Sequence, residues 1–551
     1  TREDCVNRLR RDKSRPHKPL AVMVPREGPD GLARLRRLVA VTPDHVTLLE
    51  DPLAPVVLVP RHGEGADPLA AGIAPGLGDL GVMLPYSPLH HLLVQGVGVP
   101  LICTSANASG APMITESGEL RRSMGAQLDG ILDHDRAIRR PVEDGVYRVS
   151  AGRGRPLRLG RGAIPLEGSL EVALSFPLLA LGGWMKNTVA LAWGRRVVLS
   201  PTAGELEHPG GRERCAHTVA DLQALYGVCP RLVLHDAHPD MAGLCSQVVP
   251  GVPSRAVYHH AAHASALAGE YPGVDDWLVF TWDGLGWGPD GTLWGGEALR
   301  GRPGAWRRVG SFRPFRLPGA ARAAREPWRS AAALCWEAGL ALPQAPADVQ
   351  LLRGAWRREV GTLWTSAVGR LFDAAAALTG LCREATYEGQ GPALLEAAAA
   401  SVVEDVPRLP LIRDMAGVWR SDWGTLLPWL LDERRSVAQR AGGFHLTLAQ
   451  ALVDQARQIV SRDGVGPTVG LCGGVFQNRR LLEAAVAGLE REGFSVRLAQ
   501  RLPCNDAALA WGQVVEAGAG MNLERDSIAQ HLDMGAAPVH VPGEDFTKGC
   551  Q

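Results

Sequence analysis

Two glycine-rich segments with the same order of strands and turns constrain the fold of this chain most strongly. The first is LLALGGWMKNTVALAWGRRVVLS at residues 178–200, and the second is LVFTWDGLGWGPDGTLWGGEAL at residues 278–299. In each, an apolar run leads through a glycine-rich turn into a second apolar run, which is typical of a β-hairpin. Two such units, each followed by helices, predict an internally duplicated fold that clamps a nucleotide between its halves. The segments match in pattern rather than in residue identity.

The chain divides into two blocks. Residues 1–166 alternate short apolar runs with helix-like stretches such as 87–94, which is typical of a mixed α/β domain. The apolar runs that we expect to be strands are 19–24, 46–49, 55–59 and 100–104. A segment rich in Gly, Pro and Arg at 153–165 predicts a last strand and a linker. We therefore expect one domain over residues 1–166 and a second over residues 167–519.

The end of the second block has the pattern of a doubly wound α/β unit. The sequence predicts a strand and a glycine turn in PTVGLCGGVFQN, then a helix at 479–492, a strand at 496–499 and a helix at 506–518. Residues 520–551 show no periodicity that predicts an element. We treat them as a tail of unknown structure.

Composition excludes several classes of protein. The 551 residues carry a formal net charge of zero, with 46% hydrophobic and 21% charged residues, so we expect a globular protein without a nucleic-acid partner. None of the ten cysteines forms a C-x-x-C pair, which favours a reducing, cytoplasmic compartment. No apolar run reaches membrane-spanning length and no signal peptide opens the sequence, so we expect no membrane partner.

A histidine pair predicts a metal site. His259 and His263, in VYHHAAHASAL, are four residues apart and share one face of a helix. A lone buried histidine is more often a structural residue, but two imidazoles at this spacing converge on one ion. Asp283, which ends a strand, and Asp506, which opens a helix, are the best-placed carboxylates, although turns and N-caps use Asp too. Such a ligand set suits one iron or zinc ion.

Glycines and polar side chains in both blocks predict phosphate binding. In the second block, Gly473, Gly474 and Asn478 form a strand-to-helix turn, and Gly284 begins a matching turn in the other half; bare amides there can approach phosphates. Glycine turns alone are weak evidence.

In the first block, Lys13 and Arg15 fall on one face of an extended segment, as a phosphate-binding pair should. Hydroxyls and amides that can ligate a triphosphate or its metal follow a strand, although a Ser/Asn turn can be structural. They are Thr104, Ser105, Asn107 and Ser109.

Many collinear segments resemble the HypF family, the carbamoyltransferases that mature [NiFe] hydrogenases. In the first block the matching segments are DKSRPHKPLAVM, DLGVMLPYSPLHHLL, TSANASG and RGAIP, which are similar to a YrdC domain. In the second block they are ALGGWMKNT, HPD, HHAAHASA, DGLGWGPDGTLWGGE, REPWR, GRLFDA, YEGQ, GGVFQN and LPCND. The resemblance implies an α/β protein in which a YrdC-like twisted-sheet domain precedes a duplicated actin-like ATPase fold.

The resemblance also implies an activity. The YrdC-like domain would form carbamoyl adenylate from ATP, with Mg²⁺, and carbamoyl phosphate or carbamate, and the second domain would pass the carbamoyl group to the C-terminal cysteine of a HypE-like protein. The family's metal ligands fall on His259, His263, Asp283 and Asp506. Its nucleotide contacts fall on Lys13, Arg15, Thr104, Asn107, Lys186, Asn187, Gly284, Gly473, Gly474 and Asn478.

The sequence also departs from the family pattern. RRPVEDGV replaces residues that are usual before the paired aspartates, with Glu143 where Asp is common, and Ala261 stands where a third histidine is common. The family's N-terminal acylphosphatase and zinc-finger modules and the opening of the YrdC-like domain are absent from this sequence.

Three alternatives stay open at this stage. A tRNA threonylcarbamoyl transferase shares both domain types, but YEGQ, REPWR and the domain order disfavour it. A small-molecule O-carbamoyltransferase is expected to have the opposite domain order. The altered RRPVEDGV segment keeps a non-catalytic maturation scaffold in consideration.

Overall fold

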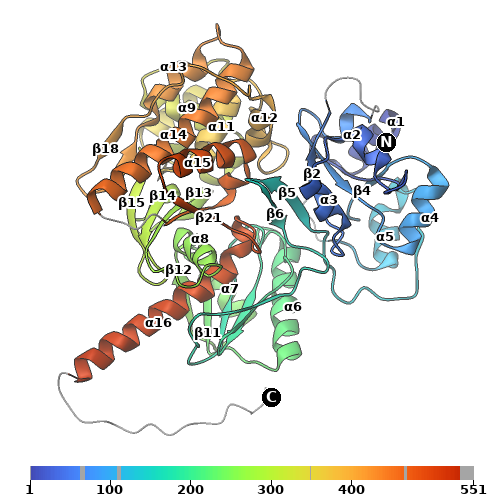
Figure 1. The fold of residues 1–551 in the computed structure, drawn as a ribbon, viewed down its shortest axis with the longest axis horizontal. Coiled ribbons are helices and arrows are strands. Elements are labelled where there is room, and N and C mark those ends of the chain that lie inside the picture. The colour runs from blue at the N-terminus through green and yellow to red at the C-terminus, as the bar shows by residue number, and fades with distance from the viewer. Residues whose placement is uncertain (1, 63–68, 108–112, 348, 464–467, 534–551) are drawn as a thin grey trace.

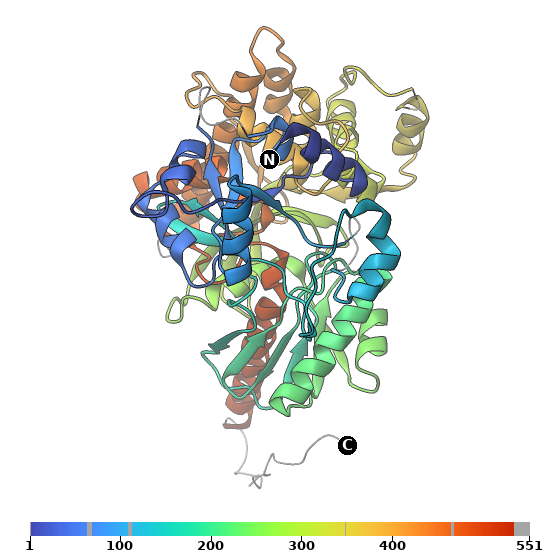
Figure 2. The same cartoon turned by 90° about the vertical axis from the view of Figure 1, so that its right-hand side faces the viewer.

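The computed structural model describes residues 2–62, 69–107, 113–347, 349–463 and 468–533. These residues form a first domain on one six-stranded sheet and a larger body built on two further sheets (Figures 1 and 2). Among the described residues, no helix is both long and apolar enough to span a membrane.

The first sheet is mixed, with parallel and antiparallel neighbours. Its strands lie in the order β4 (Leu101–Cys103), β1 (Ala21–Met23), β3 (Asp79–Met83), β2 (Val56–Pro60), β5 (Val146–Ser150) and β6 (Arg153–Arg158). The helices of this domain are α1 (Glu3–Asp12), α2 (Ala33–Leu38), α3 (Pro43–Glu50), α4 (Pro88–Val97) and α5 (Ser117–Met124), with short 3₁₀ turns η1 (Ala71–Ile73) and η2 (Gly125–Gln127). Strands β5 and β6 lie on the side that faces the second body (Figure 1).

One strand expected from the sequence is a helix. The apolar run 46–49 lies inside α3, so that prediction was wrong. Pro43 occupies the first turn, where its fixed φ suits a helix, and the Thr42 side chain caps the start by accepting from the His45 amide at 3.5 Å. Leu49 then turns into the core. A capped start and a three-residue apolar spacing outweigh the β propensity of two adjacent apolar residues.

The two halves of the second body repeat one topology, which confirms the duplication. In the first half, β8 (Leu178–Ala180), β9 (Ala190–Trp193) and β10 (Arg196–Leu199) form an antiparallel meander, and β11 (Leu232–Asp236) and β12 (Ser254–Val257) add in parallel beyond β8. In the second half, β13 (Trp277–Trp287), β14 (Leu293–Gly301) and β15 (Arg307–Phe312) form the meander, and β20 (Thr468–Cys472) and β21 (Ser495–Leu498) add in parallel beyond β13.

The remaining strands extend the edges of these sheets. They are β7 (Leu166–Ser169) beside β10, β16 (Phe315–Pro318) paired with β17 (Thr362–Thr365), β18 (Leu411–Arg413), and β19 (Trp419–Ser421) beside β15. The helices are α6 (Pro209–Tyr226), α7 (Met241–Val248), α8 (His259–Ala268), α9 (Trp328–Glu337), α10 (Val349–Arg357), α11 (Val368–Leu378), α12 (Gln390–Ala398), α13 (Leu426–Leu431), α14 (Val437–Asp463), α15 (Arg479–Arg491) and α16 (Leu509–Asp533). The 3₁₀ turns are η3 (Ala320–Ala324), η4 (Trp423–Thr425), η5 (Gly474–Gln477) and η6 (Asp506–Ala508).

Helices α8 and α16 pack against each other between the two sheets (Figure 1). A Cβ at Gly512 would lie 1.9 Å from the carbonyl oxygen of Ala262, so only glycine permits this approach of the two backbones. Because α8 follows the first sheet and η6 and α16 follow the second, their N-terminal ends bring side chains from both halves to one place.

The last helix is longer than the sequence predicts. It runs to Asp533 rather than ending at Gly518, so residues 520–533 are helical, while 534–551 lie outside the described residues. Gly518 is tolerated inside the helix because a neighbouring side chain, Leu174, fills the space beside it. This packing offsets the low helix propensity of glycine.

Candidate functional site

A cluster of two histidines and two aspartates lies where the two halves meet. One ligand atom from each of His259, His263, Asp283 and Asp506 lies within 4.8 Å of every other. The Nε2 atom of His259 is 3.1 Å from Asp283 Oδ2 and 3.9 Å from Asp506 Oδ1. The Nε2 atom of His263 is 3.4 Å and 3.6 Å from the same two oxygens. The fold therefore brings together all four residues that the sequence predicts as metal ligands.

Local structure explains how each side chain reaches the cluster. His259 and His263 are one turn apart at the start of α8. Asp283 lies where the pairing of β13 with β14 shifts register, and such a bulge re-aims a side chain. Asn505 caps η6 by accepting from the Ala507 amide at 3.1 Å, which places Asp506 in the first turn.

A third carboxylate, which sequence reasoning missed, holds one of the histidines. The Nδ1 atom of His259 donates to Asp236 Oδ2 at 2.6 Å, and Asp236 is buried at the end of β11. Its other oxygen accepts from the His238 amide at 2.8 Å. Ligating histidines usually donate their second ring N–H to such a carboxylate, which sets tautomer and ring orientation. Its position at the end of an apolar strand in LVLHDAHPD was the available signal.

The donor set and its electrostatics fit a divalent metal ion. The Nε2 atom of His263 is buried and makes no hydrogen bond among the described residues, although two carboxylates face it. Burial acts to raise the pKa of Asp283, but the hydrogen bond from His259 and the nearby ring of His263 hold this pKa well below its ordinary value. An anionic carboxylate and an unpartnered buried nitrogen at one point are what an oxygen- and nitrogen-liganded ion requires.

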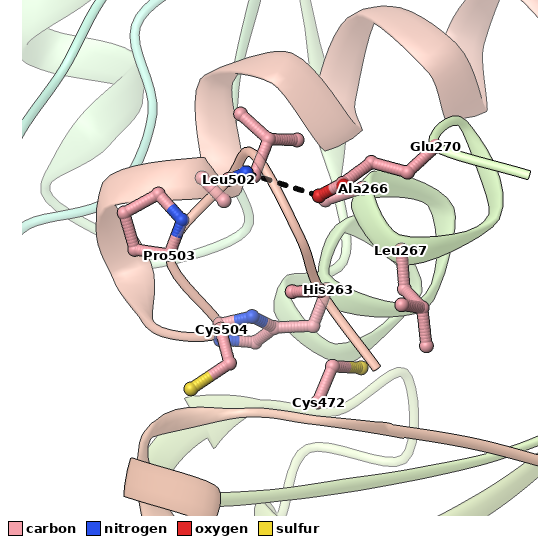
Figure 3. A pocket seen from close by; sticks show the side chains of 10 residues that line it. His263, Ala266, Leu267, Glu270, Cys472, Leu502, Pro503 and Cys504 are labelled. Carbon is pink, nitrogen blue, oxygen red and sulfur yellow. Dashed lines mark hydrogen bonds between the residues drawn. The ribbon is translucent and has the colours of Figure 1, made fainter. Parts of the chain in front are cut away.

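A small pocket beside the cluster is lined by two cysteines. It measures about 10 Å³ and lies among His263, Glu270, Cys472 and Cys504 (Figure 3), which is room for about one water molecule. Burial raises the pKa of Cys504 to about 12 and that of Cys472 well above its ordinary value. Glu270 accepts from the Leu502 amide at 3.1 Å, which fixes the adjoining loop. The two thiols thus stay protonated.

A second polar cluster lies in the first domain. The Nζ atom of Lys13 lies 3.3 Å from Thr104 Oγ1 and 3.5 Å from Asn107 Oδ1, and it donates to the carbonyl oxygen of Ser105. The Nη1 atom of Arg15 donates to the same Thr104 hydroxyl at 3.3 Å. The fold therefore brings the four first-domain residues predicted to bind nucleotide into one group. Ser109, expected on the same loop, lies outside the described residues.

This first-domain group is strongly cationic. Burial, together with the charges of Arg15 and Lys18, lowers the pKa of Lys13 to about 8. Burial likewise lowers the pKa of Lys18, with a further contribution from Arg15. Each cation disfavours its neighbour's charge, so a bound polyanion would relieve a repulsion that the free protein carries.

The three polar residues predicted to bind nucleotide in the second domain have partners within the protein. The Nζ atom of Lys186 pairs with Glu388 Oε1 at 2.5 Å. Two asparagines use their amides within the protein: Asn187 Nδ2 donates to the carbonyl of Leu181 at 2.6 Å, and Asn478 Oδ1 caps α15 by accepting from the Leu481 amide at 3.0 Å. These asparagines shape turns, and a direct contact with nucleotide remains a prediction.

The three predicted glycines lie at points of close backbone approach. The Gly474 amide donates to Asp283 Oδ1 at 2.9 Å, so this turn contacts the histidine–aspartate cluster. At Gly473, φ is +100° and an added Cβ would lie 2.2 Å from the Trp282 carbonyl oxygen. Gly284 faces Gly369 across a contact that would place a Cβ of Gly369 2.8 Å from its Cα. Their role at a nucleotide also remains a prediction.

One cavity connects the first-domain cluster with the second domain. It measures about 1270 Å³, and Lys13, Arg15 and Thr104 line it together with Lys186 and Ala507, the residue that follows Asp506. The RRPVEDGV segment, which departs from the family pattern, also lines this cavity through Glu143 and Asp144. Glu143 pairs there with Arg158, and Asp144 pairs with Arg161 at 3.3 Å.

Family models and curated relatives match this chain along nearly its whole length. A Sua5/YciO/YrdC family model, described as telomere recombination, matches residues 1–160. The HypF Kae1-like domain matches residues 174–270, and the carbamoyltransferase, Kae1-like domain, second subdomain, matches residues 279–513. The carbamoyltransferase HypF of Rhodobacter capsulatus is 38% identical over 94% of this chain and 69% of its own length. HypF2 of Cupriavidus necator is 37% identical over 93% and 68%.

Solved structures give the same result. A crystal structure of full-length HypF in a phosphate- and nucleotide-bound form has a TM-score of 0.88 at 28% identity, and covers 94% of this chain and 68% of that one. The structure of T. kodakarensis HypF has a TM-score of 0.84 at 24% identity over 95% and 70%, and supports the fold. A YrdC-like domain therefore precedes a duplicated Kae1-like body, and the chain belongs to the HypF family of carbamoyltransferases, which act in hydrogenase maturation.

Proposed function

We propose that this chain forms carbamoyl adenylate from ATP and carbamoyl phosphate or carbamate in its first domain. The second domain then transfers the carbamoyl group to the C-terminal cysteine of a HypE-like protein. The observation that carries this proposal is the cavity of about 1270 Å³ that joins the Lys13 cluster to the second domain beside Asp506. An acyl adenylate hydrolyses readily, and passage inside the protein protects it from water.

The first step needs positive charge around a triphosphate. Where carbamoyl phosphate is the donor, water first cleaves it to carbamate and phosphate. A carbamate oxygen then attacks the α-phosphorus of ATP, and the bond to the pyrophosphate oxygen breaks, so that pyrophosphate leaves. Lys13 and Arg15 face this space together with the Thr104 hydroxyl, and they can neutralise the charge that develops on the leaving pyrophosphate. A HypF relative has been solved with phosphate and nucleotide bound, which supports a nucleotide site in this fold.

In the second step a thiolate attacks the carbamoyl carbon, and AMP leaves with the electrons of the broken C–O bond. His259, His263, Asp283 and Asp506 would hold one iron or zinc ion, which would polarise a carbonyl or phosphoryl oxygen when bound. Asp236 keeps the His259 ring oriented through the hydrogen bond at its Nδ1 atom.

The acceptor thiol comes from outside this chain. Cys472 and Cys504 lie beside the histidine–aspartate cluster, but burial raises the pKa of both, so neither supplies a thiolate. A flexible C-terminal cysteine can enter a cavity between two domains, whereas a folded tRNA needs an extended basic surface. The zero net charge of this chain favours the protein acceptor.

The proposal is tested by following both half-reactions. The chain is incubated with ATP, Mg²⁺, labelled carbamate or carbamoyl phosphate, and either a HypE-like protein or bulk tRNA. We expect pyrophosphate release and label on the C-terminal cysteine. Lys13→Ala should slow pyrophosphate release at least about tenfold, because a charge-assisted hydrogen bond contributes about 1.5–3 kcal/mol.

Arg8→Ala is the matched control, because Arg8 lies on α1, the helix that Lys13 follows, and makes an exposed ion pair with Asp129. It should leave pyrophosphate release unchanged. Label on tRNA with none on the cysteine would overturn the proposed acceptor. Normal pyrophosphate release by Lys13→Ala would overturn the adenylation site.

A further inference from the structure

Arg148, on β5 of the first domain, has a side chain that ends in the second domain. Its Nη2 atom lies 2.7 Å from Asp79 Oδ2 in the first domain, and its Nη1 atom lies 3.0 Å from Glu396 Oε2 on α12. Nη1 also donates to the carbonyl oxygen of Gln477 at 3.1 Å. The side chain is only 10% exposed. A guanidinium held by a carboxylate of each domain has one defined geometry.

The Gln477 contact leads to one of the candidate metal ligands. Gln477 is the last residue of η5, and its Nε2 atom donates to the carbonyl oxygen of Gly474 at 2.9 Å. The Gly474 amide donates in turn to Asp283 Oδ1 at 2.9 Å. The turn that orients Asp283 is thus hydrogen-bonded to the first domain through Arg148.

A second contact between the domains leads to Asp506. Asn505 Nδ2 donates to the carbonyl oxygen of Leu157 on β6 at 2.9 Å, and to Gln477 Oε1 at 3.0 Å. Asn505 is 1% exposed and immediately precedes Asp506. The contacts from Arg148 on β5 and from Leu157 on β6 therefore both lead to Gln477. Its hydrogen bonds connect it to the turn that orients Asp283 and to Asn505, which precedes Asp506.

Glu396 strengthens this connection. Its Oε1 atom accepts from the Arg479 amide at 2.8 Å, so one carboxylate holds Arg148 and the start of α15. Burial acts to raise the pKa of Glu396, but Arg148 lowers it below its ordinary value. Removal of Arg148 would leave this buried carboxylate without its cation, and the turn before α15 would rearrange.

We propose that Arg148 is a positioning residue for the transfer centre: by holding Gln477 it sets the Asp283 and Asp506 carboxylates, so the first domain completes the metal site of the second. The inference rests on the proposed metal centre. It predicts that the affinity of that centre for metal depends on a first-domain side chain that is not itself a ligand.

The test measures the affinity of the intact chain for Zn²⁺ alone, by competition with a chromophoric chelator. Arg148→Met should weaken binding by about tenfold or more, the range found when partners of metal ligands are removed. Arg140→Met is the matched control, because Arg140 also pairs across the two domains, with Asp221 at 3.2 Å, but both side chains are more than half exposed. It should leave the affinity unchanged.

Two further variants separate positioning from folding. Arg148→Lys keeps the charge but cannot serve both carboxylates and the Gln477 carbonyl, so it should give an intermediate affinity at a near wild-type melting temperature. Gln477→Ala breaks the same path, so its effect and that of Arg148→Met should be less than additive in the double variant.

The outcomes distinguish this inference from the metal centre on which it rests. A wild-type chain that binds no Zn²⁺ would overturn the metal centre and the inference with it. Equal affinities for wild type, Arg148→Met and Arg148→Lys would overturn the inference alone, as would fully additive effects of Arg148→Met and Gln477→Ala.

Discussion

Lys13 is the residue whose ionisation bears most directly on the first step. Its pKa is lowered to about 8 by burial and by Arg15 and Lys18. A lysine binds phosphate in its protonated form, which is lost as the pH rises through the pKa. The cation that we propose for triphosphate binding is therefore present below about pH 8 and disappears above it.

This behaviour predicts that the affinity for a non-hydrolysable ATP analogue falls as the pH rises through about 8. Lys13→Arg should abolish the fall, because arginine stays charged over this range. Calorimetric titrations on either side of that pH measure the effect, with Lys18→Arg as the control. An affinity that does not change with pH in wild type, or that falls equally in Lys13→Arg, would contradict the assignment.

At the scale of the element, the turn between β20 and η5 matters most, because it connects the sheet to the histidine–aspartate cluster. Gly473 has φ +100°, and a Cβ there would lie 2.2 Å from the Trp282 carbonyl oxygen. Its amide donates to the Cys504 carbonyl at 2.7 Å, which ties the turn to the loop before Asp506. The turn has no freedom to accept a side chain.

Gly473→Ala should therefore lower stability by about 2–4 kcal/mol, from backbone strain and steric overlap together. Gly194→Ala is the control, because Gly194 has φ +53° at a hairpin turn but nothing lies within 4 Å of an added Cβ. There only the left-handed backbone strain of about 1–2 kcal/mol applies. Calorimetric melting compares the two variants, and equal melting temperatures would refute this explanation.

At the scale of the whole molecule, the cavity between the domains is the feature that two separate domains would lack. Ala393, on α12, lines this cavity. Ala393→Trp should leave pyrophosphate release near the wild-type rate while carbamoyl transfer falls, because the adenylate is still made but its path is narrowed. Parallel assays of pyrophosphate and of labelled acceptor measure the ratio.

Ala220→Trp is the control for this variant, because Ala220 lies exposed on α6 and does not line the cavity. Wild-type transfer by both tryptophan variants would show that the adenylate does not pass through this space.

The sequence by itself determined the features that depend on local spacing. The pair His259 and His263 needs only the helical repeat to share a face, and the two glycine-rich hairpins need only their order of strands and turns to predict a duplicated body. Lys13 and Arg15 were found because they are near neighbours in the chain. Local spacing also gave one wrong prediction, a strand at 46–49, because helix capping decided the structure there.

Tertiary structure alone decided which residues from distant segments meet. Asp236 is 23 positions from His259, and Arg148 is 329 positions from Gln477, so no periodicity connects them. The same holds for Glu388, which pairs with Lys186 from 202 positions away. Such contacts depend on how sheets and domains pack, because a buried charge needs a partner that only the folded chain can supply.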